Sequence, residues 1–519
     1  MNLSKTDNII NSNSKKNKRI LINTALLYFR MLILLGVSLY TSRIVLKNLG
    51  VEDFGIYSVV GGIVIMFSFL NSSMSSATQR FISFELGSKN NENLQKIFIM
   101  CVNIHLLIAL TIFVIAETIG LWFLNTYLII PPERMVAANW VYQFSILSFL
   151  FTIISVPYNA FIIANERMNV YAYVGIIEVV LKLLTVFSLA WFGFDKLKLY
   201  GVLIFIVTVF IWLIYRVYCF RKFKVTKYQF LWDKVLFKTL MNYSGWNLFG
   251  SMAGVTMGQG INILLNLFFN PAINAARAIS YQVNGAINGF VSNFQIALKP
   301  QIVISFAKND MEHMHQLIFQ GAKYSYFLLY IISLPLIFEM EFVLKFWLNT
   351  VPDYTVLFCQ LILINALIDC VSGPLITAAQ ATGEIKKYQI IIGSLLLLNL
   401  PVSYIVLGIG MGPQTTIYTS IIISVFCLFT RLLILKPMIS ISISKFFNEV
   451  IYLVLLISLC SLILPSVIVF YVNPNNTRIF FVIAASTGSC IISIYYIGIN
   501  SKERKFFKTK LKQLIKKHH

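Results

Sequence analysis

The chain has 519 residues, of which 58% are hydrophobic and 12% are charged, and its mean hydropathy is +0.78. A soluble globule of this size needs a larger polar surface, so the composition excludes one and predicts an integral membrane protein. The net charge of +22 does not indicate nucleic acid as a partner, because the basic residues cluster between apolar segments.

Long apolar segments in chain order predict an all-α integral membrane protein with about 14 transmembrane helices. Each segment reaches the roughly 20 residues that a helix needs to cross the hydrocarbon core of a bilayer. The predicted spans are residues 20–46, 54–84, 97–124, 135–163, 170–193, 199–218, 239–268, 272–304, 317–347, 355–380, 388–409, 415–436, 449–472 and 479–499.

The distribution of basic residues predicts the orientation of these spans. If both termini are cytoplasmic, the inner segments hold 27 Lys and Arg residues and the outer segments hold 5. Cytoplasmic segments of membrane proteins are enriched in Lys and Arg, and one missed helix would destroy this asymmetry. We therefore expect both termini to be cytoplasmic.

Two halves of the chain match at an offset of about 219 residues. Placing Lys89 on Lys308 also places Arg80 on Lys299, and a second region matches at nearly the same offset; chance matching of apolar residues is the alternative. The offset crosses six helices, an even number, so it predicts two parallel six-helix repeats. The expected organisation is a cytoplasmic basic N-terminal tail 1–19, an N-lobe 20–218, a cytoplasmic basic linker 219–238 that lies on anionic headgroups, a C-lobe 239–436, two additional helices 437–499 and a cytoplasmic basic tail 500–519.

Motifs of hydrolytic and nucleotide-binding enzymes are missing from the sequence. It contains no GxSxG, HExxH or GxxxxGK[ST] motif, and its seven cysteines lie in or beside apolar helices without CxxC pairing. We therefore expect a protein that is not an enzyme, with no catalytic residues, no metal site and no cofactor. Any transport would depend on an ion gradient or a membrane potential.

Basic residues inside predicted spans are the strongest functional signal, because a charge in the hydrocarbon core costs from about 2.5 to more than 10 kcal/mol. Arg30 lies near the middle of the first span, and Arg277 lies towards the outer end of the eighth. Arg80 and Lys299 lie near the inner ends of repeat-related spans, where snorkelling to headgroups is the alternative for Arg80. Two cations brought together by the repeat would bind an anion such as phosphate or pyrophosphate.

Two acidic residues are candidates for a coupling-ion or proton site. Asp369 lies beside Pro374, where a broken helix would expose backbone carbonyls. Glu178 lies four residues before Lys182, so an ion pair within one helix is the alternative.

Four stretches carry a family resemblance: SRIVLKNLGVEDFGIYSVV (42–60), SSATQRF (75–81), NER (165–167) and ATGE (381–384). The chain resembles the Wzx-type polysaccharide flippases, in the polysaccharide transporter branch of the MOP exporter superfamily. The resemblance implies a V-shaped pair of six-helix lobes followed by two extra C-terminal helices. It also implies that cations lining the lobes bind pyrophosphate, here Arg30, Arg80, Arg277 and Lys299.

The implied function is the transfer of polyprenyl-pyrophosphate-linked oligosaccharides across the bacterial cytoplasmic membrane, for O-antigen, capsule or exopolysaccharide assembly. The implied partners are this lipid-linked substrate, membrane lipids, a polysaccharide polymerase and glycosyltransferases. One alternative is a MATE-like cation-coupled multidrug antiporter, which would place acidic residues in its central cavity. Another is a non-transporting membrane scaffold of a glycan assembly complex, which would not need repeat-related charges.

Overall fold

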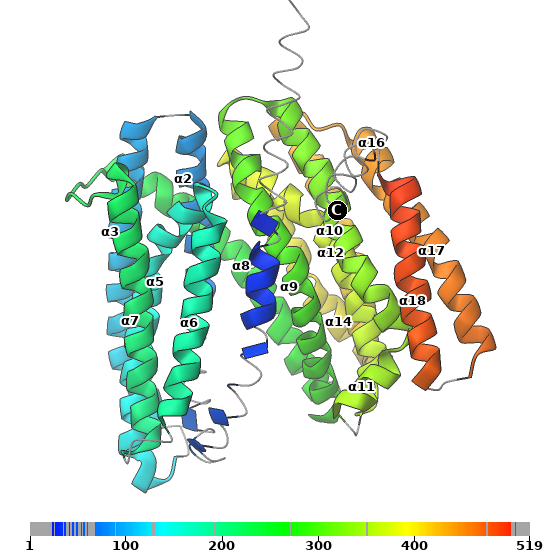
Figure 1. Ribbon diagram of the computed structural model, residues 1–519, viewed down its shortest axis with the longest axis horizontal. Coiled ribbons are helices and arrows are strands. Elements are labelled where there is room, and N and C mark those ends of the chain that lie inside the picture. Colours follow the sequence, from blue (N-terminus) through cyan, green and yellow to red (C-terminus); the bar gives the residue numbers. More distant parts are fainter. Residues whose placement is uncertain are drawn as a thin grey trace, which may run out of the picture. The chain divides into compact units, whose positions relative to one another are not determined.

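The computed structural model (Figure 1) describes much of the chain but leaves out parts of the first two predicted spans and much of the stretch 42–60. The predicted tails 1–19 and 500–519, apart from Arg504, also lie outside the described residues. The described residues are 23–24, 26–34, 36–37, 41, 44–45, 48–49, 53, 56–57, 60, 68–88, 90–126, 130–189, 194–269, 271–348, 351–473, 476–499 and 504.

All regular secondary structure in these described ranges is helical, which confirms the predicted fold class. The chain divides into two compact units. The first contains Met1–Met252 and Lys299–Asp310, and the second contains Ala253–Leu298 and Met311–His519. Two long helices, α8 (Lys234–Phe268) and α9 (Pro271–Ala307), contribute residues to both units.

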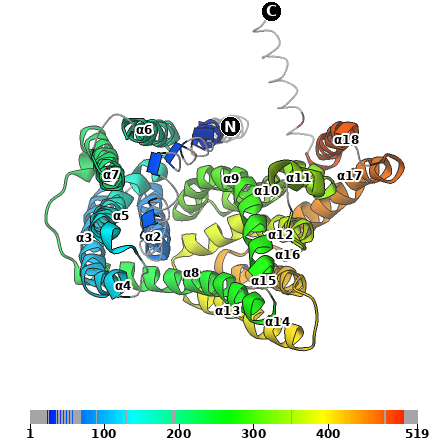
Figure 2. The ribbon, with the colours of Figure 1, turned by 90° about the horizontal axis from the view of Figure 1, so that it is seen from below.

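Helix α5 is the centre of the first unit, where it packs against α2, α3 and α7 (Figure 2). Its buried side chains include Val141, Tyr142 and Ile146, which form one apolar cluster. The helical elements of this unit besides the first part of α8 and the last part of α9 are α2 (Ser68–Ser88), α3 (Asn91–Ile115), the π-turn η1 (Ala116–Gly120), α4 (Leu121–Thr126), η2 (Pro132–Arg134), α5 (Met135–Ala164), α6 (Met168–Ser188), α7 (Lys196–Lys222) and η3 (Lys224–Thr226).

Helix α12 has the corresponding place in the second unit, where it packs against α10 and α15. The fourth and tenth predicted spans are therefore the central helices of the two units, as a parallel repeat requires. The other elements of this unit are α10 (Met311–Phe338), α11 (Met340–Leu348), α12 (Thr355–Thr382), α13 (Lys386–Leu397), α14 (Asn399–Gly408), α15 (Thr415–Ile439), α16 (Ile443–Phe446), η4 (Phe447–Ile451), α17 (Tyr452–Tyr471), α18 (Asn476–Ser493) and η5 (Ile494–Gly498).

Eleven helical segments in the described residues are long and apolar enough to span a bilayer, and each coincides with a predicted span. The chain is thus a multi-pass membrane protein. The eighth predicted span is the helix α9, and the second contains α2; neither reaches the hydropathy of the other spans, because both are rich in Ser, Asn and Gln. Two predicted spans are interrupted: 317–347 divides at Glu339 into α10 and α11, and 388–409 divides at Leu398 into α13 and α14.

The additional helices α17 and α18 belong to the second unit; hydroxyl groups attach α17 to α10, and an ion pair joins α18 to the end of α10. Tyr326 and Ser458 share a hydrogen bond of 2.6 Å between their hydroxyl oxygens, and the Tyr330 hydroxyl donates to the Ser458 carbonyl at 3.1 Å. At the end of α10, Arg478 Nη2 donates to Glu339 Oε2 at 3.0 Å. Interhelical hydrogen bonds of this kind fix helices that lipid alone would leave unoriented.

Arg134 joins two other parts of the first unit through its hydrogen bonds to Asp53 and Asp195. Arg134 Nε donates to Asp53 Oδ1 at 2.8 Å, and its Nη1 donates to Asp195 Oδ2 at 2.9 Å. Asp195 also caps α7, because its side chain accepts from the backbone amide of Leu197. Burial acts to raise the pKa of Asp195, but the hydrogen bonds and charge of Arg134 and the capped amides outweigh it and lower the pKa.

Candidate functional site

Arg30 lies beside α6 in the first unit. Its guanidinium carbon is 4.4 Å from the ring centre of Tyr171. A Cβ atom on Gly175, one turn further along α6, would overlap Arg30 Nε, so a larger residue at this position would displace the Arg30 side chain. Arg30 Nε is buried and has no hydrogen-bond partner among the described residues.

Glu178 lies on the same helix, one turn beyond Gly175. Lys182 Nζ donates to Glu178 Oε1 at 2.6 Å, which confirms the predicted ion pair within α6. The Glu178 carboxylate therefore has a partner of opposite charge on its own helix, and its role at a coupling-ion site stays a prediction.

Arg80 is buried on α2, with 7% of its surface exposed, and contacts aromatic rings. Its guanidinium carbon lies 4.6 Å from the ring centre of Phe81, 4.9 Å from Phe84 and 5.7 Å from Tyr243 of α8. A cation over ring faces is attracted by the negative faces of the rings. Arg80 is thus enclosed within the first unit, although it lies near a helix end in the predicted topology.

Lys299 contacts the same face of α2. Its Nζ donates to Ser76 Oγ at 2.9 Å, and Ser76 lies one helical turn before Arg80. The first unit therefore brings these two predicted residues to adjoining turns of one helix. Neighbouring bonds hold the same region together, since Asn247 Nδ2 donates to the Ser73 carbonyl at 3.0 Å.

The NER turn between α5 and α6 also contacts the last part of α9. Glu166 adopts a left-handed backbone conformation (φ 57°) that usually favours glycine at a helix C-terminus. Its buried carboxylate accepts a hydrogen bond from Gln301 Nε2. The hydrogen bond from Gln301 therefore helps to hold Glu166 in a backbone conformation that glycine adopts with less strain.

Arg277 lies in the second unit and is bound by its own neighbours. Its Nη1 donates to the Gly258 carbonyl at 3.1 Å and to Asn262 Oδ1 at 2.5 Å, both on α8. Its Nη2 donates to the Tyr281 hydroxyl at 3.2 Å. An anion at Arg277 would therefore have to replace existing hydrogen bonds.

Asp369 has an exposed side chain on α12 and lies in a polar cluster of the second unit. Asn365 Nδ2 donates to Asp369 Oδ2 at 2.9 Å, and Arg431 of α15 interacts with the carboxylate electrostatically. Arg431 is itself buried, with its Nε 3.1 Å from the Tyr388 hydroxyl and its Nη1 3.0 Å from Ser372 Oγ. The cluster thus joins α12, α13 and α15.

The helix at Pro374 is not broken, contrary to expectation, since α12 runs from Thr355 to Thr382. Proline cannot donate to the carbonyl four residues earlier, which is that of Cys370. Gln295 Nε2 of α9 donates to this carbonyl at 3.0 Å, and Gly373 provides the space for the Gln295 side chain. The carbonyl is therefore satisfied within the unit, as buried backbone in a membrane requires.

Sequence reasoning missed Arg431. Its signal was the same as that of Arg30, a single arginine inside an apolar span, but it falls late in the twelfth span. Its pairing with Asp369 could not be read from the sequence, because 62 residues separate the two positions. Across the described ranges, no three His, Cys, Asp or Glu side chains come together as a metal site.

Known proteins share the fold at low sequence identity. A family profile described as MatE matches residues 27–187, and no curated protein sequence matches the chain. An outward-facing multidrug resistance MATE family transporter of the MOP superfamily is 12% identical, with a TM-score of 0.68 over 80% of this chain and 95% of that chain. A MATE structure in a bent conformation is 12% identical, with a TM-score of 0.71 over 82% of this chain and 96% of that chain.

A third structure, the Vibrio cholerae MATE transporter VcmN in a bent form, is 16% identical, with a TM-score of 0.67 over 83% of this chain and 98% of that chain. The matches extend over nearly the full length of each solved transporter, so they include helices of both units. The predicted membership in the polysaccharide flippase branch remains a prediction. The chain has the fold of the MATE transporters of the MOP superfamily.

Proposed function

We propose that the chain is a flippase that moves polyprenyl-pyrophosphate-linked oligosaccharides across the bacterial cytoplasmic membrane by alternating access. Both termini would be cytoplasmic, and the product would enter surface polysaccharide assembly with a polymerase and glycosyltransferases. The observation that carries this proposal is Arg30, a cation inside the first predicted span whose buried Nε receives no hydrogen-bond partner from the described residues. A deep cation in a membrane protein usually marks a substrate or ion pathway.

The chemistry of the surrounding residues suits a pyrophosphate. One guanidinium group can donate two parallel hydrogen bonds to two phosphate oxygens. The Arg30 guanidinium packs on the ring of Tyr171, which would hold it in place for such a bidentate contact. Arg80 lies on α2, and Lys299 contacts α2 one turn away at Ser76. Both would add positive potential in the same unit.

Helix α9 provides a surface that suits a sugar. The residues Ala278, Gln282, Gly285 and Ser292 are exposed and follow one another at helical spacing, which places them along one stripe. The stripe contains small and polar side chains, whereas a lipid-facing stripe would be apolar. We expect it to face water and the hydroxyl groups of the oligosaccharide.

The proposal can be tested in proteoliposomes that contain a polyprenyl-pyrophosphate-linked sugar, with transfer measured by access of an external glycosidase. Wild-type protein should expose the sugar, Arg30→Ala should not, and Arg30→Lys should recover only part of the activity, because an ammonium group makes no bidentate contact. Lys96→Ala is the matched control, because it removes a paired cation from α3 of the same unit and touches none of the candidate site residues. Full activity of Arg30→Ala would exclude Arg30 from the cargo site.

A second candidate function is a MATE-like cation-coupled multidrug antiporter. It is favoured by the exposed carboxylate of Asp369 in the second unit, which could exchange a proton or a metal cation. The same proteoliposomes distinguish the two functions. Export of a cationic dye under a sodium or proton gradient, abolished by Asp369→Asn and with no movement of the lipid-linked sugar, would favour the antiporter.

A further inference from the structure

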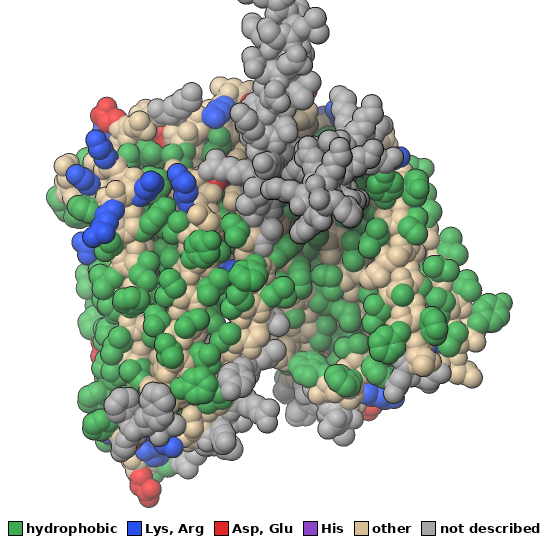
Figure 3. Space-filling view, in the orientation of Figure 1, with side chains coloured by type: hydrophobic (Ala, Val, Ile, Leu, Met, Phe, Trp, Pro, Cys, Tyr) green, Lys and Arg blue, Asp and Glu red, His purple; other side chains and the backbone are tan. Residues whose placement is uncertain are grey.

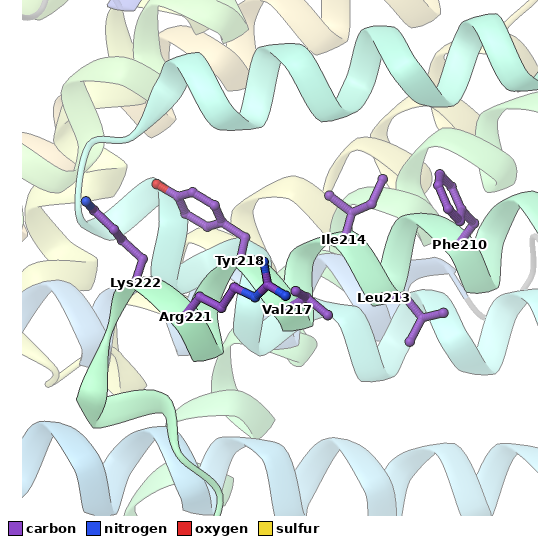
Figure 4. Close-up of a pocket in the computed structure, with 7 residues that line it drawn as sticks. All are labelled: Phe210, Leu213, Ile214, Val217, Tyr218, Arg221 and Lys222. Carbon is purple, nitrogen blue, oxygen red and sulfur yellow. The ribbon is translucent and has the colours of Figure 1, made fainter.

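An open groove runs along one side of α7 in the first unit, with a volume of about 590 Å³, and all of its lining side chains belong to α7 (Figure 4). Its side chains change character along the helix. Tyr218, Arg221 and Lys222 lie at one end, and the remaining part is lined by apolar side chains, from Phe210 to Val217. The groove is therefore amphipathic along its length.

The apolar part of the groove is exposed at the surface of the first unit. Phe210 is 47% exposed, Leu213 is 41% exposed and Val217 is 44% exposed. They lie on α7, which is one of the most apolar of the candidate membrane spans. Exposed side chains of this type in a membrane span contact acyl chains. From Phe210 to Lys222 the helix rises about 18 Å, close to the depth of one leaflet, which is roughly half of a 30 Å core.

The polar end of the groove is strongly basic. Arg221 and Lys222 are exposed there, and Lys224 and Lys227 follow in the linker. The sequence contains no Asp or Glu between Lys196 and Trp232, so no acidic side chain of this stretch neutralises these cations. Figure 3 shows Lys and Arg side chains gathered at one end of this unit, next to a band of hydrophobic side chains.

The linker after α7 is fixed in place at the same end. Asn103 of α3 accepts a hydrogen bond from the Tyr228 hydroxyl at 2.8 Å and donates to the Leu231 carbonyl at 2.8 Å. Phe230 and Trp232 are exposed nearby in the sequence, and aromatic side chains of this kind are enriched at the level of lipid headgroups. The basic end of the groove therefore lies where the headgroup of a lipid in the groove would be.

We infer that this groove binds a phospholipid with an anionic headgroup, its phosphate at Arg221 and Lys222 and one acyl chain along Phe210, Leu213 and Val217. Charge complementarity selects the lipid class, since each basic residue near an anionic surface contributes about a fivefold increase in affinity. The site lies on the first unit alone and does not depend on the transported substrate.

The inference can be tested by native mass spectrometry of the full-length protein purified from mixed micelles of phosphatidylglycerol and phosphatidylcholine. Wild-type protein should retain phosphatidylglycerol preferentially. The double variant Arg221→Gln/Lys222→Gln should bind it roughly 25-fold more weakly, from the loss of two such residues. The matched control Lys196→Gln/Lys198→Gln removes the same charge from the other end of α7 and should bind like the wild type.

A third variant, Val217→Trp, fills the apolar part of the groove without a change of charge and should also reduce retention. Equal retention by the wild type and Arg221→Gln/Lys222→Gln would overturn the inference. So would equal retention of the two phospholipids by the wild type. Displacement of phosphatidylglycerol by stoichiometric polyprenyl phosphate would also overturn it, because the groove would then belong to the polyprenyl chain of a substrate.

Discussion

Each unit of the molecule buries an arginine within a predicted membrane span, and the residues around the arginine differ between the two units. In the first unit, Arg80 lies against the rings of Phe81, Phe84 and Tyr243. In the second unit, Arg431 donates to the hydroxyl groups of Tyr388 and Ser372 and interacts with a carboxylate. The same sequence signal can thus correspond to an arginine packed on aromatic faces or to an arginine that hydrogen-bonds two buried hydroxyl groups, and removal of the second leaves those hydroxyl groups without their donor.

The largest expected effect follows from this difference. Arg431→Leu should destabilise the protein by about 2–4 kcal/mol, because it leaves the buried hydroxyl groups of Tyr388 and Ser372 without their donor and removes the charge that faces Asp369. Arg80→Leu should cost less than Arg431→Leu, because leucine keeps apolar contact with the three rings. Unfolding in detergent, followed by intrinsic fluorescence, measures both. Equal losses for the two variants would remove the distinction between the units.

The second expected effect concerns Gln295 and the repeat-related position Ser76. Gln295→Leu should cost about 1–2 kcal/mol, because the Cys370 carbonyl loses its donor, whereas Ser76→Ala removes a hydroxyl that accepts from Lys299. In a Pro374→Ala background the helix recovers its own donor to this carbonyl, so Gln295→Leu should cost less than half as much. Additive losses in this double-mutant cycle would show that the carbonyl does not depend on Gln295.

The smallest expected effect concerns Arg134 and its two carboxylates in the first unit. Arg134→Gln should lower the stability at pH 7 by about 1 kcal/mol, because all three side chains are partly exposed. The pKa of Asp195 is lowered in the folded protein, so its contribution is present above the unfolded value near 3.9 and is lost as the pH falls through the folded value.

Thermal unfolding between pH 7 and pH 3 measures this contribution. The difference between the wild type and Arg134→Gln should shrink as the solution becomes acidic. Arg134→Lys is the control, because lysine keeps the positive charge without the paired contacts to Asp53 and Asp195. Its stability should lie between those of the wild type and Arg134→Gln. A difference that stays constant over the whole range would show that the aspartates do not stabilise the fold through Arg134.

The apolar spans and the helical repeat could be predicted from the sequence, because the length and composition of each span depend on the bilayer rather than on distant contacts. Contacts between distant residues could not. Gly175 makes room for Arg30 only because two helices meet there, and Asn103 holds the linker from 125 residues away, at Tyr228. The sequence predicted this linker as a basic loop and gave no sign that its path is fixed.

Two proline residues in the second unit have consequences for the order of membrane insertion. Pro374 has no backbone N–H for the Cys370 carbonyl, which accepts from Gln295 instead. Pro465 likewise has none for the Ser461 carbonyl, which accepts from the Ser489 hydroxyl at 2.9 Å. Gln295 is synthesised before α12, so the donor for the Cys370 carbonyl is already present when α12 enters the bilayer. Ser489 is synthesised after α17, so a nascent chain that ends before α18 would hold an unsatisfied carbonyl in lipid. The last hairpin should therefore insert as a pair, and ribosome-bound chains that end after α17 should remain with the insertion machinery.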